Sequence, residues 1–221
     1  MATPLRIDFV SDVACPWCVI GLRSLMKALE AVGDDVEAEI HFQPFELNPD
    51  MAPEGENTTE HVIKKYGSNP ERSAASRNAM KESGDALGFT FNYGPQSRIW
   101  NTFDAHRLLH WAGVEGKQHE LKEALFKANF TDQLSTSDHE VLVGAAKAAG
   151  LDDRRARQVL VSGEFTDEVR RDEMLWRNRG ISAVPSVIFN QRWMVQGGQP
   201  PQVFEQAIRQ IVSGNAEDAR A

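Results

Sequence analysis

Two cysteines separated by two residues, Cys15 and Cys18, are the residues of this sequence best suited to chemistry, and the chain contains no others. Two thiols at this spacing can close into a small disulfide ring and open again by exchange with another disulfide. The thiolate is the attacking species, and a free cysteine has a pKa of roughly 8.5. We therefore expect a reversible dithiol–disulfide pair, whose behaviour depends on the elements that hold it.

The sequence around the pair predicts a strand-to-helix junction. Residues 5–11 alternate apolar and polar side chains as a strand does, and apolar residues recur at helical spacing over 18–32. Pro16 suits the first turn of that helix, because the N–H that proline lacks would be unpaired there. A helix N-terminus favours negative charge. Cys15 is therefore predicted to be the more acidic, more exposed nucleophile, and Cys18 the buried thiol that resolves the mixed disulfide.

An acidic residue, Asp12, lies three positions before Cys15, and Asp8 lies four positions before that. A carboxylate close to the thiols would oppose thiolate formation or relay a proton. The alternative is a solvated charge or a helix cap. We count Asp12 among the supporting residues of the site, together with Pro16 and Trp17.

Zinc binding is an alternative interpretation, because two cysteines at this spacing can also ligate a metal. The remaining ligands would be His106 and His110, which lie far downstream in a helical segment. We therefore expect no metal. A purely structural disulfide is also disfavoured, because closing so short a loop constrains little of the unfolded chain.

The composition excludes two broad classes of function. The formal net charge is −8, which argues against a nucleic-acid surface, and no apolar run approaches the roughly 20 residues of a membrane span. The first residues carry no apolar signal-peptide core. We therefore expect a cytoplasmic protein, in which a lone pair of cysteines is more plausibly catalytic than structural.

Along the chain, predicted strands come before and after a mainly helical middle segment. A second alternating strand covers 36–44, and 49–179 reads almost wholly as helix after a connection rich in proline and glycine. Residues 186–189 and 192–195 read as paired strands, and a closing helix follows from Pro201. The predicted layout is β-α-β, a helical insertion, and then β-β-α.

Motif and layout together resemble the DsbA family of thioredoxin-fold proteins. The residues that carry the resemblance are Ser-Asp-Val-Ala-Cys-Pro-Trp-Cys at 11–18 with Gly21, and Gly-Ile-Ser-Ala-Val-Pro-Ser-Val at 180–187. Within that family the chain most resembles the FrnE-like branch, close to 2-hydroxychromene-2-carboxylate isomerases. Asn101-Thr102 and the run from Ala105 to Arg107 also look like that branch.

The resemblance implies an α/β fold, namely a thioredoxin fold with an inserted all-helical domain. Residues 1–48 and 180–214 would form a discontinuous thioredoxin-like domain. Residues 49–179 would form the insertion, and 215–221 a tail.

The resemblance also implies a cis peptide bond before Pro185, facing Cys15. Cis geometry would let the backbone N–H and C=O of Val184 pair with an extended substrate segment. The insertion would cover the active site, with Trp100 and Asn101 near the cleft. The alternative for Trp100 is an ordinary core residue.

The predicted activity is thiol–disulfide exchange on protein or small-molecule disulfides. The alternative is a glutathione-dependent isomerase or transferase, but that branch typically has serine where Cys15 stands and lacks a second thiol. A third possibility is a redox-sensing or holdase-type binding protein. No cofactor is expected beyond the dithiol itself, and glutathione is the candidate co-substrate. The sequence leaves the direction of electron flow and the oligomeric state open.

Overall fold

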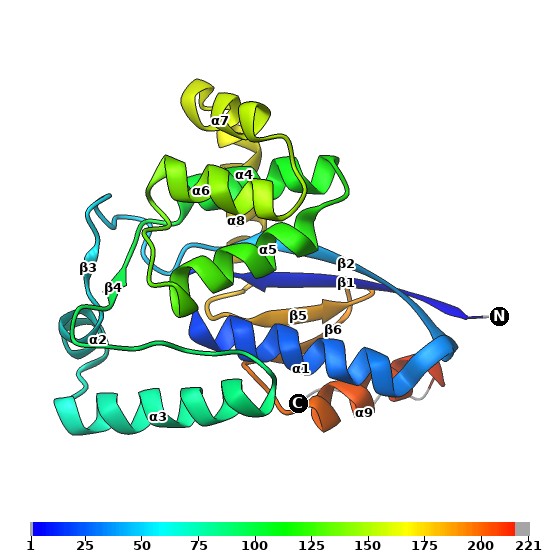
Figure 1. Ribbon diagram of the computed structural model, residues 1–221. Helices are drawn as coiled ribbons and strands as arrows, with labels where there is room; N and C mark the ends of the chain where they lie inside the picture. Colours follow the sequence, from blue (N-terminus) through cyan, green and yellow to red (C-terminus); the bar gives the residue numbers. More distant parts are fainter. Residues whose placement is uncertain (1, 215–221) are drawn as a thin grey trace.

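The computed structural model describes residues 2–214, so the expected tail, 215–221, lies outside the described residues. At its centre is a four-stranded sheet with the order β2-β1-β5-β6 (Figure 1). β1 is parallel to β2 and antiparallel to β5, which is antiparallel to β6. These strands are β1 (Thr3–Ser11), β2 (Val36–Pro44), β5 (Ser186–Phe189) and β6 (Trp193–Gln196). The two ends of the chain thus build one sheet, as the sequence predicts for a thioredoxin-like core.

Two helices, α1 (Pro16–Val32) and α9 (Pro201–Val212), pack on one face of this sheet. The apolar periodicity of each helix supplies one buried stripe. Side chains shared between β1 and these helices include Ile7, Phe9, Leu22, Leu25, Phe204 and Ile208. Full burial of one such side chain contributes about 1.5–3 kcal/mol, so this core holds the start of α1 firmly against the end of β1.

The opposite face of the sheet is covered by α8 (Thr166–Asn178). Val10 of β1 and Ile188 of β5 pack there against Trp176 of α8. The last helix of the insertion therefore completes the core of the sheet on this side.

The insertion divides into two groups of helices. α4 to α7 share an apolar cluster of their own and form the upper part of Figure 1, whereas α2 and α3 lie at its lower left. α3 runs beside α1, where Lys27 donates a hydrogen bond to the carbonyl of Ala86. The helices are α2 (Thr58–Tyr66), α3 (Pro70–Ala86), α4 (Phe103–Val114), α5 (Gln118–Phe126), α6 (His139–Ala148) and α7 (Asp153–Ser162).

The insertion also contains a short two-stranded sheet, which the all-helical expectation did not include. β3 (Glu56–Asn57) pairs antiparallel with β4 (Arg98–Ile99). Two-residue strands carry no periodicity that a sequence could display. Their pairing brings the segment before α2 next to the segment before α4.

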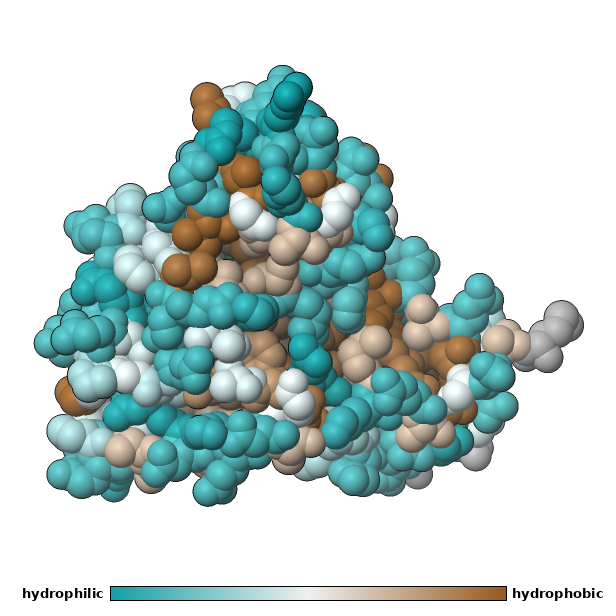
Figure 2. All heavy atoms as spheres, viewed as in Figure 1, coloured by the Kyte–Doolittle hydropathy of each residue, from teal (hydrophilic) through white to brown (hydrophobic). Residues whose placement is uncertain are grey.

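The face of the molecule seen in Figure 2 agrees with the polar composition. Figure 2 shows a mostly hydrophilic face, with hydrophobic residues visible in the recesses between helices. Among the helices of residues 2–214, none is long and apolar enough to cross a bilayer.

Candidate active site

The two cysteines lie at the start of α1, as predicted. Cys15 is the N-cap residue, Pro16 is the first residue of the helix, and the N–H of Cys18 donates to the carbonyl of Cys15 at 3.0 Å. Both cysteines are free thiols. Cys15 is 3% exposed and Cys18 is fully buried, so Cys15 is the more exposed of the two, as predicted, although both thiols are buried.

The peptide bond between Val184 and Pro185 is cis and faces Cys15. The thiol of Cys15 donates to the carbonyl oxygen of Val184 at an Sγ–O distance of 3.6 Å. This carbonyl is the group expected to pair with substrate. Once Cys15 has lost its proton or joined a mixed disulfide, it no longer donates, and the carbonyl of Val184 becomes available.

Glycine at position 21 allows α1 to approach this cis-proline segment closely. A Cβ atom on Gly21 would lie 2.9 Å from Cγ of Pro185, which is closer than such atoms normally come. A Cβ on Gly198 would similarly meet the backbone and ring of Trp17 at 3.0 Å. Both glycines therefore permit the close packing that brings the cis-proline segment to the thiols.

Burial raises the pKa of the Cys18 thiol well above its ordinary value, and the neighbouring Cys15 raises it further. A positive charge on Lys122 acts in the opposite direction. A thiol with a raised pKa stays protonated near neutral pH. Cys18 is therefore expected to remain protonated while Cys15 makes the first attack.

Asp12 is buried, and its carboxylate fastens three segments of the chain together. Oδ1 accepts hydrogen bonds from the Thr102 hydroxyl at 2.8 Å and from the N–H of Ala14 at 3.1 Å. Oδ2 accepts from the N–H of Leu47 at 2.7 Å. Nε2 of His106 lies 3.5 Å from Oδ1. The alternative of a solvated charge is therefore wrong for Asp12.

The surroundings of Asp12 favour its ionised form. Burial by itself raises its pKa, but His106 and the N–H groups of Leu47 and Ala14 outweigh burial, and the net effect lowers the pKa. Hydrogen bonds to the charged form of a carboxyl are a general cause of such lowering. Asp12 is thus a buried anion below the turn that carries Cys15.

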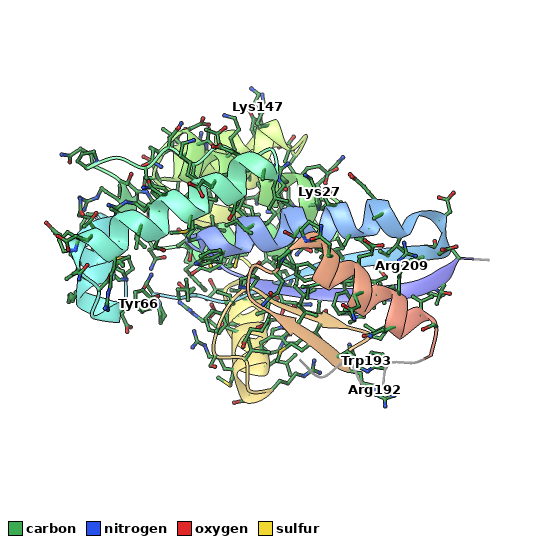
Figure 3. The ribbon with its side chains drawn as sticks, turned by 90° about the horizontal axis from the view of Figure 1, so that it is seen from below. Lys27, Tyr66, Lys147, Arg192, Trp193 and Arg209 are labelled. Atoms are coloured by element: carbon green, nitrogen blue, oxygen red, sulfur yellow. The ribbon has the colours of Figure 1, made fainter. Side chains whose placement is uncertain are left out.

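Both tyrosines of the chain lie close enough to Cys15 for its charge to affect them. Burial is the main cause that raises the pKa of Tyr93, and a negative Cys15 adds to it; the same two causes raise the pKa of Tyr66. The Tyr93 ring stacks on Phe91 with 5.7 Å between ring centroids. Figure 3 shows Tyr66 at the end of α2, on the side of the molecule where α1 begins. No spacing in the sequence singles out either tyrosine.

Trp100 and Asn101, predicted to lie near the cleft, make contacts with other parts of the insertion. The Asn101 amide donates to the carbonyl of Met51 and accepts from the N–H of Phe103, each at 2.9 Å. The guanidinium carbon of Arg98 lies over the Trp100 ring, 5.4 Å from the ring centroid. The following residue, Thr102, is the one whose side chain reaches Asp12.

The remaining candidate residues separate into two groups. Trp17, which lies between the two cysteines in the sequence, is 39% exposed. His106 is directed to Asp12, whereas Nδ1 of His110 lies 3.8 Å from a carboxylate oxygen of Asp172. The two histidines of α4 therefore have different partners, which does not favour the shared metal site considered above.

Comparison with known proteins agrees with this arrangement. A solved structure of a probable DsbA oxidoreductase from Streptomyces coelicolor is 34% identical with a TM-score of 0.89, covering 95% of this chain and 90% of that chain. Protein YwbO of Bacillus subtilis (strain 168), uncharacterized, is 26% identical over 205 residues, which are 92% of this chain and 96% of YwbO. A structure of 2-hydroxychromene-2-carboxylate isomerase shares the fold, with a TM-score of 0.71 at 15% identity, covering 96% of this chain and 98% of that chain.

The family match spans nearly the whole length of the fold. Residues 6–209 match the DSBA-like thioredoxin domain, a range that begins in β1, ends in α9 and includes both cysteines and the cis-proline segment. This chain therefore belongs to the family of proteins with a DSBA-like thioredoxin domain.

Proposed function

We propose that this chain is a thiol–disulfide oxidoreductase in which Cys15 attacks and Cys18 resolves. The observation that carries the proposal is the position of the Cys15 thiol, at the N-cap of α1 and 3.6 Å from the carbonyl that precedes the cis bond of Pro185. This arrangement places a nucleophile, a second thiol and a backbone acceptor at one point.

The proposed reaction has two exchange steps. The Cys15 thiolate attacks one sulfur of a substrate disulfide, a mixed disulfide forms, and the other half of the substrate leaves as a thiolate. Cys18 then loses its proton and attacks the Cys15 sulfur. The bond between Cys15 and the substrate breaks, the substrate is reduced by two electrons, and the protein is left with a disulfide between Cys15 and Cys18. Each step is reversible, so the same residues serve oxidation of a dithiol.

The two parts of the chain have different roles in this proposal. Residues 1–48 and 180–214 carry the reacting groups, and 49–179 select what reaches them. Support comes from the burial of Cys15 and Cys18 in an apolar cluster that also includes Phe91, Phe126 and Phe130 of the insertion. Trp100 and Asn101 remain proposed determinants of substrate binding within the insertion.

Glutathione is the proposed small-molecule co-substrate. A pocket of about 460 Å³ lies between the segment after β2 and α2, lined by Leu47, Asn48, Lys64 and Lys65 among others. The N–H of Leu47 binds Asp12, so this pocket borders the active-site turn. Lys64 is 79% exposed and its ammonium lies 3.7 Å from a carboxylate oxygen of Glu56; in this proposal it also attracts a carboxylate of glutathione.

A glutathione-dependent isomerase of the 2-hydroxychromene-2-carboxylate type is the second candidate, and the shared fold is the observation that favours it. The two candidates differ in their need for Cys18. Isomerisation through bound glutathione requires at most one thiol, whereas complete disulfide exchange requires two. If Cys18→Ser no longer turns over the substrate of the wild-type protein, the result would support the oxidoreductase. If it turns over that substrate as fast as the wild type, the result would support the isomerase.

A cytoplasmic location and a place in the FrnE-like branch are part of the same proposal. They rest on the sequence features around Cys15 and in the insertion. Immunodetection in fractionated cells tests the location, and recovery with an extracytoplasmic fraction would refute it.

Equilibration with reduced and oxidised glutathione tests the proposed function. The wild-type protein should exchange two electrons reversibly, with one midpoint that is the same when approached from either side. Cys15→Ser and Cys18→Ser should each abolish formation of the intramolecular disulfide. A wild-type protein whose two thiols do not interconvert with a disulfide would refute the proposal.

A further inference from the structure

The peptide group between Val13 and Ala14 is held from both sides by buried side chains. Its carbonyl, on Val13, accepts a hydrogen bond from the amide Nδ2 of Asn129 at 3.0 Å. Its N–H, on Ala14, donates to Oδ1 of Asp12 at 3.1 Å. Asn129 is 7% exposed and Asp12 is 1% exposed, so both side chains are shielded from water. Two residues far apart in the sequence therefore fix the orientation of a peptide group that lies directly before Cys15.

The same peptide group is the centre of the turn that leads into α1. The N–H of Cys15 donates to the carbonyl of Asp12 at 3.2 Å, which makes Val13 and Ala14 the two central residues of a four-residue turn. Neither central residue has a positive φ, which excludes a type II turn. Rotation of the central peptide group by about half a turn separates type I from type II. The hydrogen bonds to Asn129 and Asp12 oppose this rotation, because it would exchange the positions of the C=O and the N–H.

Asn129 reaches this peptide group from an irregular turn at the end of α5. Residues Lys127–Thr131 form a single π-helical turn, in which the N–H of Asp132 donates to the carbonyl of Lys127 at 2.9 Å. All three residues at the centre of the turn, 128–130, are buried. A single π-helical turn at the end of a helix is uncommon, and such turns occur frequently at functional sites.

The insertion holds Val13 by its side chain as well as by its carbonyl. The Val13 side chain is fully buried and belongs to the apolar cluster of α4 to α7. Without the Nδ2 donor of Asn129, the Val13 carbonyl would be buried with no hydrogen-bond partner, which is a costly arrangement. The turn would then relax towards other conformations, and the backbone of Cys15, at the end of the turn, would move with it.

We propose that Asn129 is a positioning residue for the nucleophile, because it locks the turn that ends at Cys15 in one conformation. The lock keeps the Cys15 thiol beside the carbonyl of Val184, at an Sγ–O distance of 3.6 Å. Asn129 acts through the peptide group of Val13 and not on the reacting sulfurs. This inference rests on the proposed dithiol chemistry and adds to it a residue of the insertion.

The attack by Cys15 can be measured alone in the full-length Cys18→Ser protein, which serves as the reference. Rapid mixing with dithiodipyridine, a chromogenic disulfide, forms a mixed disulfide on Cys15. The other half of the reagent leaves as a chromophore, and no second release follows because the resolving thiol is absent. The rate is expressed per folded molecule, with the folded fraction taken from circular dichroism of the same sample.

Asn129→Ala in this reference removes the donor to the Val13 carbonyl. At pH 7 it should slow the release by about 10- to 100-fold per folded molecule, the effect expected when a reacting group is misplaced by about 1 Å. Asn92→Ala is the matched control, because the exposed Asn92 donates from its own Nδ2 to the carbonyl of Thr131, in the same π-helical turn, at 2.7 Å. The control should leave the rate of the reference unchanged.

Asn129→Asp keeps the shape of the side chain and makes the donor depend on pH. An ionised carboxylate cannot donate, so at pH 7 this variant should be as slow as Asn129→Ala, whereas a protonated carboxyl donates an O–H. The ordinary aspartate pKa is about 3.9 and burial raises it, so part of the reference rate should return at pH 5. Rates are compared with the reference and with Asn129→Ala at the same pH, because Asp12 and His106 are common to all three proteins.

The reference rate per folded molecule in Asn129→Ala would overturn the proposal, even if the variant were less stable, because Asn129 would then be structural only. Equal slowing by Asn92→Ala would also overturn it. If Asn129→Ala does not fold, Asn129→Asp decides, and a rate relative to the reference that does not rise from pH 7 to pH 5 would overturn the proposal. Failure of the reference protein to release any chromophore would instead refute the proposed function itself.

Discussion

The hydroxyl of Thr102 donates a hydrogen bond of 2.8 Å to the buried carboxylate of Asp12, across 90 positions of the sequence. This bond ties the start of α4 in the insertion to the turn that carries Cys15. The same carboxylate accepts from the N–H of Leu47, after β2. The insertion and the thioredoxin-like sheet therefore share one buried anion, and the geometry of the thiols depends on both.

Asp12→Asn should lower the free energy of unfolding by about 2–4 kcal/mol at pH 7, because an amide cannot satisfy the donors of Leu47, Ala14 and Thr102 together. The pKa of Asp12 is lowered in the folded protein, so its stabilisation is present above the ordinary aspartate pKa of about 3.9 and is lost as pH falls further. Urea denaturation at pH 7 and pH 3 measures both effects.

The difference between wild type and Asp12→Asn should therefore shrink on acidification. Asp34→Asn is the control, because Asp34 is exposed and should change stability by no more than about 0.5 kcal/mol. Equal stability of Asp12→Asn and wild type at pH 7 would contradict the role assigned to this carboxylate.

The contribution of Glu46 to stability is expected to depend on pH in the opposite sense to that of Asp12. Burial and the nearby charge of Glu173 raise its pKa to about 7, although Arg170 hydrogen-bonds to both carboxylates. The folded protein therefore holds an extra proton between about pH 4.5 and 7, and stability falls as pH rises through this window. Glu46→Gln should be more stable than wild type at pH 8 by about 1–3 kcal/mol and nearly equal to it at pH 5. Thermal melting at both pH values tests this, and a variant less stable than wild type at pH 8 would refute it.

The sequence predicted those parts of the site that depend on local signals. Alternation in β1, helical spacing after Cys18 and the preference of proline for a first helical turn together place Cys15 at the N-cap of α1. The resemblance at 180–187 correctly implied the cis bond before Pro185. These features are visible because each depends on a few neighbouring residues.

The parts that the sequence did not reveal depend on tertiary contacts. A threonine, a histidine and a lysine in a helical region give no sign that Thr102 and His106 will meet Asp12, or that Lys122 will be buried. The type of turn between β5 and β6 could not be predicted from the sequence either, because neither Asn190 nor Gln191 is glycine. Both adopt positive φ, at 49° and 56°, since the twist of a tight hairpin requires it.

Gly21→Ala tests the close packing of α1 on the cis-proline segment. The added Cβ would meet Cγ of Pro185 at 2.9 Å, so the segment that faces Cys15 must move. We expect a loss of about 1–3 kcal/mol of stability and slower disulfide exchange per folded molecule. Gly144→Ala is the matched control, because its Cβ would meet no atom within 4 Å and alanine favours a helix. If both substitutions had the same effect, the close approach of Gly21 to Pro185 would have no functional role.

Trp100→Ala tests whether the insertion selects the substrate. If Trp100 acts at the cleft, the variant should turn over substrate more slowly while its redox equilibrium with glutathione stays unchanged. Trp111→Ala provides the comparison, because Trp111 is buried in the insertion and its truncation should cost about 3–5 kcal/mol of stability. A large stability loss in Trp100→Ala with unaltered kinetics per folded molecule would assign Trp100 to the core.

Capture of substrate by the single-cysteine variants tests the central claim most directly. Cys18→Ser should accumulate a mixed disulfide between Cys15 and the substrate, because the resolving attack is absent. Cys15→Ser should capture none, since Cys18 is fully buried and its pKa is raised. Mass spectrometry of the intact proteins after reaction with a disulfide substrate measures both adducts. An adduct on Cys18→Ser alone is the predicted result, and equal capture by Cys15→Ser would contradict the assignment of Cys15 as nucleophile and Cys18 as resolving thiol.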